Sequence, residues 1–221
     1  YQISTSHLAR EVTTRIDAGE FDWKKFGGVH PAPFGNRIAA DMIGQLLDEC
    51  WAAAPAAGAA AKPYAMPAKP LDEAHYGGGR FLELNAATLS EQWKTGIPDW
   101  GKIPGSKRDR FTKIPILEAD KPGASLTVEF NGSAVGAYVV AGPDAGTVEV
   151  SIDGGAVSTV NLFHGFSAGL HYPRTVLFAD ALPPGKHTLA LKISEEKDPR
   201  SKGNAMRAVQ LVVNEPKLPP N

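Results

Sequence analysis

The stretch Thr127–Gly155, TVEFNGSAVGAYVVAGPDAGTVEVSIDGG, decides which kind of fold this chain forms. It contains short apolar runs in which β-branched residues recur at every second position. Glycine, proline, asparagine and aspartate stand between the runs. Alternation with a period of two, bounded by residues that favour turns, indicates short strands rather than helices. The stretch therefore predicts consecutive β-strands joined by tight turns.

The same pattern continues on both sides of this stretch. Short β-rich runs follow one another from residue 125 to residue 213, and no helical pattern separates them. The runs are SLTVEF, VGAYVVA, TVEVSID, STVNLF, RTVLFA, HTLALKI and RAVQLVV. Seven or more strands without intervening helices are typical of an antiparallel β-sandwich.

Three turns between these runs carry recognisable signals. Asn131-Gly132 and Asp153-Gly154 are predicted to form tight hairpin turns, because both dipeptides tolerate positive φ angles. The sequence LPPGKH, Leu182–His187, predicts a prolyl turn that leads into the penultimate strand. Asn131-Gly132-Ser133 also matches a glycosylation sequon, but a two-residue turn explains it completely.

The N-terminal region has a helical pattern instead. Apolar residues recur every four positions in residues 4–18, where Ser4–Ser6 offer N-caps and Gly19 can end the helix. A second helix is predicted from Asn36 to Trp51, with a wide apolar stripe that needs a large packing partner. About fifty residues without a strand make a poor independent domain. We therefore expect this region to be the end of a larger domain.

The chain is predicted to be α+β overall and to have three parts. Residues 1–51 form the helical part, residues 52–72 form an extended linker rich in alanine and proline, and residues 73–217 form the β-sandwich. The net charge of -1 provides no electrostatic attraction for nucleic acid or an anionic membrane. No apolar run approaches the length of about 20 residues that spans a bilayer.

The cysteine content and the first residues of the chain further restrict which chemical features we expect. The single cysteine, Cys50, excludes an intramolecular disulfide and a multi-cysteine zinc site, and we expect it to be a half-buried structural thiol. The first residues, YQISTSHLAREV, contain no export signal.

His30 is the residue most suited to catalysis. It follows Gly27-Gly28 and precedes Pro31, which restricts the backbone on both sides of it. This sequence presents the imidazole on a short, stiff loop at the start of a helix. An imidazole with a pKa near 6.5 suits a general base, although a purely structural turn would have the same sequence features.

The segment EFDWKKFGGVHPAPFGNRIAADMIGQLL, Glu20–Leu47, resembles the final catalytic block of the SGNH (GDSL-type) hydrolases. The resemblance covers residues 5–50. It implies the end of an α/β/α domain in which a serine attacks an ester carbonyl and His30 is the general base. No GDS triplet occurs in the chain, so the resemblance places the nucleophile in an N-terminal half of the same hydrolase, outside this chain. The aspartate that usually stands three residues before the histidine is Gly27 here, and Asp22 is the nearest carboxylate that could orient the imidazole.

Residues 120–195 resemble the jelly-roll modules appended to bacterial SGNH carbohydrate esterases. This resemblance implies an acylated glycan, in particular an O-acetylated one, as substrate and a secreted or periplasmic location. A glycan requires flat aromatic faces and polar groups in a shallow concavity. The candidate substrate-binding residues lie in two segments and are Phe163, His164, Phe166, His171, Tyr172 and Arg174, together with Trp93 and Trp100. The alternative is that these aromatic residues fill the core.

No metal or other cofactor is expected. His164 and His171 lack a metal-ligand spacing and a carboxylate partner. The leading hypothesis is a carbohydrate esterase that removes O-acetyl groups by a Ser-His mechanism, with this chain inactive by itself. The alternative is a non-catalytic glycan-binding β-sandwich, and a weaker option is an esterase of phospholipids or simple esters.

Overall fold

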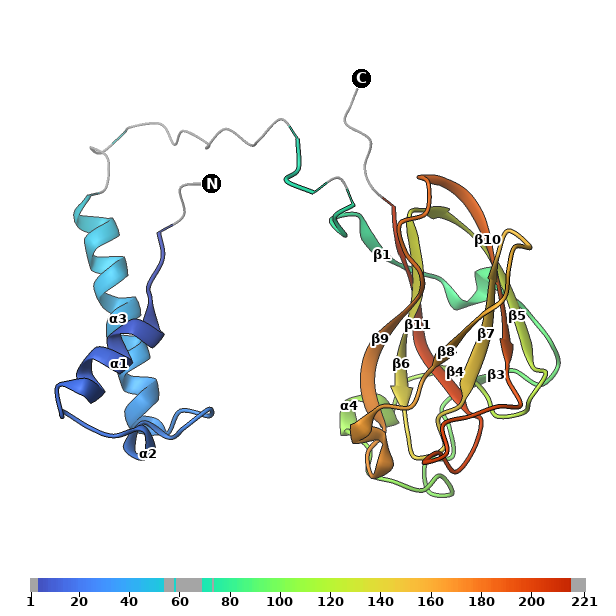
Figure 1. Cartoon of the computed structure of the whole chain (residues 1–221), viewed down its shortest axis with the longest axis horizontal. Helices are drawn as coiled ribbons and strands as arrows, with labels where there is room; N and C mark the ends of the chain where they lie inside the picture. The colour runs from blue at the N-terminus through green and yellow to red at the C-terminus, as the bar shows by residue number, and fades with distance from the viewer. Residues whose placement is uncertain (1–3, 54–57, 59–68, 73, 216–221) are drawn as a thin grey trace. The chain divides into compact units, whose positions relative to one another are not determined.

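A computed structural model describes residues 4–53, 58, 69–72 and 74–215 (Figure 1). The chain divides into two compact units, residues 1–69 and residues 70–221, and each is described by itself. Most of the predicted linker, residues 52–72, lies outside the described residues. None of the described helices is both long enough and apolar enough to cross a membrane.

The first unit is helical. Helix α1 spans Leu8–Asp17, α2 spans Trp23–Phe26 and α3 spans Pro33–Ala52. Both predicted long helices therefore form. The predicted serine N-cap of α1 is wrong, because Nδ1 of His7 accepts the hydrogen bond from the backbone N of Arg10 at 3.2 Å. Gly19 has a φ of 77° just after α1, as the sequence predicts.

The helical unit has a small core made of Val12, Phe21, Phe26 and Ile38. Only part of the apolar stripe on α3 contributes to this core. Its residues Ile43, Leu47 and Trp51 recur every four positions and are exposed, with Trp51 67% exposed. The prediction of a half-buried Cys50 is wrong, since this thiol is also exposed at the end of the same helix. The unit thus leaves one face of its longest helix uncovered by described residues.

The second unit is a sandwich of two antiparallel sheets (Figure 1). The strands are β1 (Gly79–Leu82), β2 (Thr88–Leu89), β3 (Lys94–Gly96), β4 (Ile116–Ala119), β5 (Ser125–Gly132), β6 (Ala134–Ala141), β7 (Thr147–Ile152), β8 (Ser158–Asn161), β9 (Tyr172–Ala179), β10 (Gly185–Ile193) and β11 (Met206–Asn214). The short helical segments are η1 (Leu84–Ala86), α4 (Asp109–Thr112) and η2 (Gly165–Ala168). The seven predicted runs correspond to β5–β11, whereas β1–β4 are strands that the sequence did not predict.

One sheet has the order β3-β4-β11-β6-β9, and β1 pairs with the C-terminal half of β11. The other sheet has the order β2-β5-β10-β7-β8. Along β5, exposed and buried residues alternate strictly, so one side chain in two enters the space between the sheets. The resulting core includes fully buried residues from both sheets, such as Leu117, Leu126, Leu189 and Leu211. The antiparallel β-sandwich predicted from the sequence is thereby confirmed.

The two predicted hairpins have different outcomes. Asp153 and Gly154 have φ angles of 54° and 71° and lie in the turn between β7 and β8, which pair with each other. The prediction for Asn131-Gly132 is wrong, because β5 and β6 belong to different sheets. At Gly132 the chain crosses between the sheets and passes close to β11. A Cβ atom there would lie 2.4 Å from the carbonyl O of Asn214, so glycine is required by this approach rather than by a hairpin.

Candidate functional site

The turn that carries His30 is built by α2. Oδ1 of Asp22 accepts a hydrogen bond from the backbone N of Lys25 at 2.7 Å and caps this short helix. Gly27 and Gly28 then end it with φ angles of 108° and 71°. Only glycine adopts two successive conformations of this kind without strain. The chain therefore reverses sharply just before His30.

Further contacts close the turn. The backbone N of Ala32 donates to the carbonyl O of Phe26 at 2.9 Å, so His30 lies within a hydrogen-bonded loop. Helix α3 packs directly on this loop. A Cβ atom at Gly35 would lie 2.3 Å from the carbonyl O of Phe26, and this contact explains the glycine. His30 itself is exposed at the surface of the helical unit.

The structure does not bring the predicted acid to the histidine. The carboxylate of Asp22 is engaged with the start of α2, and no hydrogen bond between Asp22 and His30 is found among the described residues. Position 27 cannot hold an aspartate in this backbone. A Cβ atom there would lie 2.0 Å from the backbone N of Ala32, and the φ of 108° disfavours any side chain. Asp22 therefore positions the turn through α2, and this turn contains no carboxylate aligned with the imidazole.

In the β-sandwich, three predicted residues form a surface cluster, which we call the aromatic cluster: His164, Phe166 and Tyr172. The His164 and Tyr172 rings stack with centroids 4.8 Å apart, and Phe166 meets Tyr172 edge-on at 5.3 Å. Phe166 is 64% exposed. Nδ1 of His164 accepts a hydrogen bond from the backbone N of Phe166 at 3.2 Å and caps η2, the short helix that contains Phe166. Stacked and edge-on contacts of this kind are the favourable geometries for aromatic pairs, and they leave the exposed Phe166 ring available to a ligand.

The other predicted binding residues lie elsewhere. Phe163, His171 and Trp93 are buried, so in this structure they pack in the interior and do not face solvent. Arg174 and Trp100 are half-buried. Loop segments rich in aromatic residues contain both inward-facing and outward-facing side chains, and the sequence does not distinguish them.

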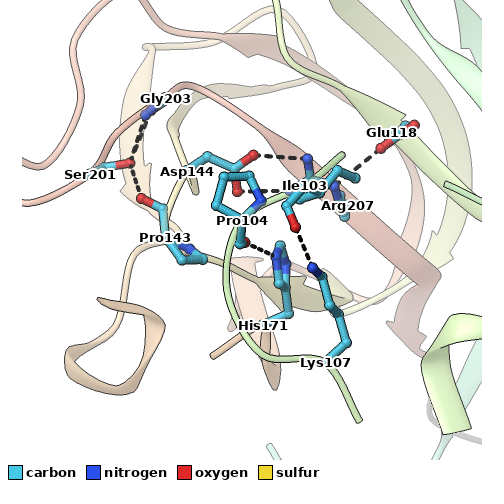
Figure 2. Close-up of polar contacts among 10 residues, drawn as sticks. All are labelled: Ile103, Pro104, Lys107, Glu118, Pro143, Asp144, His171, Ser201, Gly203 and Arg207. Carbon is cyan, nitrogen blue, oxygen red and sulfur yellow. Dashed lines mark hydrogen bonds and ion pairs between the residues drawn. The ribbon is translucent and has the colours of Figure 1, made fainter. Parts of the chain in front are cut away.

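The β-sandwich also contains a polar network around Arg207, whose members were not predicted from the sequence (Figure 2). Arg207, only 6% exposed, donates from Nη1 and Nη2 to the two carboxylate oxygens of Asp144, each at 2.9 Å. Its Nε donates to Oε2 of Glu118 at 3.1 Å. Burial alone would raise the pKa of Asp144, but the hydrogen bonds and charge of Arg207 outweigh burial and lower it. The only sequence signal for this network is an arginine at the start of the apolar run RAVQLVV.

His171 belongs to the interior next to this network (Figure 2). Its Nε2 lies 2.9 Å from the carbonyl O of Pro104, while its Nδ1 has no hydrogen-bond partner among the described residues. Burial lowers the pKa of His171, which keeps the imidazole neutral with Nε2–H as donor. A Cβ atom at Gly142 would lie 2.2 Å from its Cε1, so that glycine makes room for the ring. His171 is thus a packing residue that holds loop 97–107.

Several loops meet around this network, at the end of the sandwich where β11 begins. Ser201 Oγ donates to the carbonyl O of Gly203 at 3.0 Å, and the backbone N of Lys202 donates to the carbonyl O of Pro143 at 2.8 Å. Lys107 Nζ donates to the carbonyl O of Ile103. We call this region the loop end. Within the described part of the chain, it contains no group of three or more His, Cys, Asp or Glu residues placed to hold a metal ion.

Solved structures that are similar to this chain include two esterases. One is a two-domain esterase active on acetylated mannans, co-crystallised with mannopentaose. It has a TM-score of 0.65 and 14% identity, covering 95% of this chain and 54% of the esterase chain. The other is also described as a two-domain esterase active on acetylated mannans. It has a TM-score of 0.66 and 16% identity, covering 94% of this chain and 54% of the esterase chain.

The chain therefore spans about half the length of these esterases, and identities this low establish a shared fold alone. No protein-family model matches the sequence, and no curated protein matches it.

Proposed function

We propose that this chain is part of an SGNH-type carbohydrate esterase, in which the helical unit supplies the general base His30 and the β-sandwich binds the glycan. The observation that carries the proposal is the turn around His30. Its two glycines, its proline and its closing hydrogen bond between Phe26 and Ala32 hold an exposed imidazole at the start of α3. A preorganised base is what ester hydrolysis by a serine requires.

In the proposed reaction, a serine hydroxyl attacks the acyl carbonyl while the imidazole of His30 takes the hydroxyl proton. The protonated imidazole then gives this proton to the departing sugar oxygen, and an acyl-enzyme remains. Water, deprotonated by His30, releases acetate and regenerates the serine. Asp22 contributes by capping α2, so its role is to position the turn.

We place the serine in an N-terminal half of the same hydrolase that packs against the helical unit. The uncovered apolar residues support this placement. Ile43, Leu47 and Trp51 of α3 are exposed, and so is Val29 beside His30. Contiguous exposed apolar residues mark surfaces that are covered by another part of a protein. A partner that buries Val29 would also lie close to His30.

The substrate that we propose is an O-acetylated glycan, and the location is secreted or periplasmic. Support comes from the aromatic cluster, whose exposed Phe166 and stacked Tyr172 suit the apolar face of a sugar ring. The shared fold with esterases described as active on acetylated mannans is consistent with this substrate class.

The test uses the full-length polypeptide that contains this sequence, with 4-nitrophenyl acetate and acetylated mannan as substrates. His30→Ala is expected to lower kcat/KM by about 10²–10⁴-fold, the usual contribution of a general base. His75→Ala, which replaces an exposed histidine of the other unit, is the control and leaves the rate unchanged. Labelling with an organophosphonate is expected to modify a serine outside these 221 residues. Full activity of His30→Ala would overturn the catalytic assignment.

The second candidate function is glycan binding without catalysis. The observation that favours it is that the aromatic cluster is held by hydrogen bonds within the β-sandwich alone, through η2. If no serine is labelled while acetylated mannan still binds, and Phe166→Ala weakens that binding, the non-catalytic function is the correct one.

A further inference from the structure

A polar depression lies at the loop end, and none of the residues that line it belongs to the aromatic cluster. It has a volume of about 330 Å³ and is lined by side chains that carry hydrogen-bonding groups. These are Gln92, Lys94, Asp99, Lys102, Glu118, Asp120 and Arg207. We call this depression the Arg207 pocket. None of its residues was identified from the sequence as a binding residue.

Strand pairing aligns three of these residues in one row. Lys94 of β3 pairs with Glu118 of β4, and Glu118 pairs with Arg207 of β11. Three neighbouring antiparallel strands therefore place an ammonium, a carboxylate and a guanidinium side by side. Because these side chains project from strands rather than from a mobile loop, the row is preorganised.

Arg207 lines the pocket and has donors that form no hydrogen bond with another described residue. A guanidinium has five N–H groups, and three of them are used by Asp144 and Glu118. Figure 2 shows the guanidinium held between these two carboxylates, so its position is fixed before a ligand arrives. Glu118 uses one carboxylate oxygen for Arg207, and its Oε1 is left with no hydrogen bond to another described residue.

The charges of the pocket favour a neutral ligand. Its lining contains three cationic side chains, Lys94, Lys102 and Arg207, and three carboxylates, Asp99, Glu118 and Asp120. Asp99 and Lys102 form an ion pair at 2.8 Å, and Glu118 is paired with Arg207. An anion would meet carboxylates and a cation would meet ammonium groups, whereas hydroxyl groups can both donate to the carboxylates and accept from the cations.

We infer that the Arg207 pocket binds one neutral sugar unit of a glycan, as a subsite distinct from the aromatic cluster. The inference rests on the glycan-binding role proposed for the β-sandwich. Hydroxyl groups of the sugar accept from Lys94 Nζ and donate to Glu118. A single sugar unit held without an aromatic face binds weakly, and we expect a Kd on the order of 1 mM.

The test is a titration of the full chain, uniformly labelled with ¹⁵N, with mannopentaose and with a galacturonic acid trimer, followed by amide chemical shifts. Mannopentaose is expected to shift the amides of residues 92–94, 118–120 and 207. Lys94→Ala is expected to raise the Kd measured at these amides at least fivefold, and Lys113→Ala, which replaces an exposed lysine outside the pocket, leaves it unchanged.

The outcomes separate this inference from the proposed function. Shifts confined to residues 164–172 would overturn the pocket and leave the proposed glycan binding intact. Tighter binding of the galacturonic acid trimer than of mannopentaose would overturn the assignment to a neutral sugar. Absence of shifts with both sugars would overturn the pocket and the glycan-binding role together, while the dependence of hydrolysis on His30 is tested independently.

Discussion

Arg207 donates two parallel hydrogen bonds to Asp144, from Nη1 to Oδ1 and from Nη2 to Oδ2, each at 2.9 Å. The two residues are 63 positions apart in the chain, and this ion pair ties the start of β11 to the loop after β6. Arg207 also lines the Arg207 pocket. The pair therefore contributes to the stability of the sandwich and holds one side chain of the proposed sugar subsite in place.

Arg207→Met is expected to lower the free energy of unfolding of the β-sandwich by about 3–5 kcal/mol, because it leaves the Asp144 carboxylate without its partner in a half-buried site. Urea unfolding followed by near-UV circular dichroism measures this change. Arg108→Ala, which removes an exposed arginine, is the control. A loss of less than about 1 kcal/mol would mean that the pair behaves like a surface ion pair.

The pH dependence of stability at the turn after β7 reflects His187 and Asp153. Nδ1 of His187 lies 2.7 Å from Oδ2 of Asp153, and its Nε2 lies 2.8 Å from the carbonyl O of Pro183. The hydrogen bond to Asp153, and then that to Pro183, raise the pKa of His187 above 6.5. This contribution to stability is complete below pH 6.5 and is lost as pH rises through the raised pKa.

We therefore expect the urea concentration at the unfolding midpoint of the wild type to decrease as the pH is raised from 6.5 to a value above the raised pKa of His187. The fall is expected to be smaller in Asp153→Asn, in which asparagine keeps the left-handed turn conformation but lacks the charge. The hydrogen bond from His187 also lowers the pKa of Asp153. The wild type is therefore expected to lose stability a second time in acid, as the pH falls below 3.8. Identical pH profiles for the two proteins would rule out this coupling.

Gly27→Ala tests the backbone of the His30 turn. The added Cβ would collide with the backbone N of Ala32, and the φ of 108° is strained for alanine. A loss of about 1–3 kcal/mol in the stability of the helical unit is expected. Gly44→Ala is the matched control, because nothing lies within 4 Å of its Cβ and the helix should gain about 0.5–1 kcal/mol. Equal helix stability by far-UV circular dichroism for both variants would contradict the turn geometry.

Variants at Phe163 and Phe166 distinguish a packing role from a binding role within one loop. Phe163 is 5% exposed and carries Arg200 over its ring at 5.0 Å, so Phe163→Ala is expected to cost about 3–5 kcal/mol. Phe166→Ala removes an exposed ring and should change stability by no more than about 0.5 kcal/mol. Affinity electrophoresis in acetylated mannan is expected to show weaker binding for Phe166→Ala. Equal retardation of Phe166→Ala and wild type would remove the aromatic cluster from the proposed site.

The sequence by itself determined the local structure. Period-two alternation predicted β5–β11, and four-residue periodicity predicted α1 and α3, because both patterns report which side chains one element can bury. The glycines around His30 also indicated a rigid turn, since their backbone freedom is a local property.

Only the tertiary structure decided how these elements meet. It made Asn131-Gly132 a crossing between sheets rather than a hairpin, because β5 finds its partner in β10, far along the chain. It buried Phe163 and exposed Phe166, and it brought Asp144 and Glu118 to Arg207. These outcomes depend on contacts between residues distant in sequence, whose energies are set by pairing and burial and leave no periodic signal in the segments themselves.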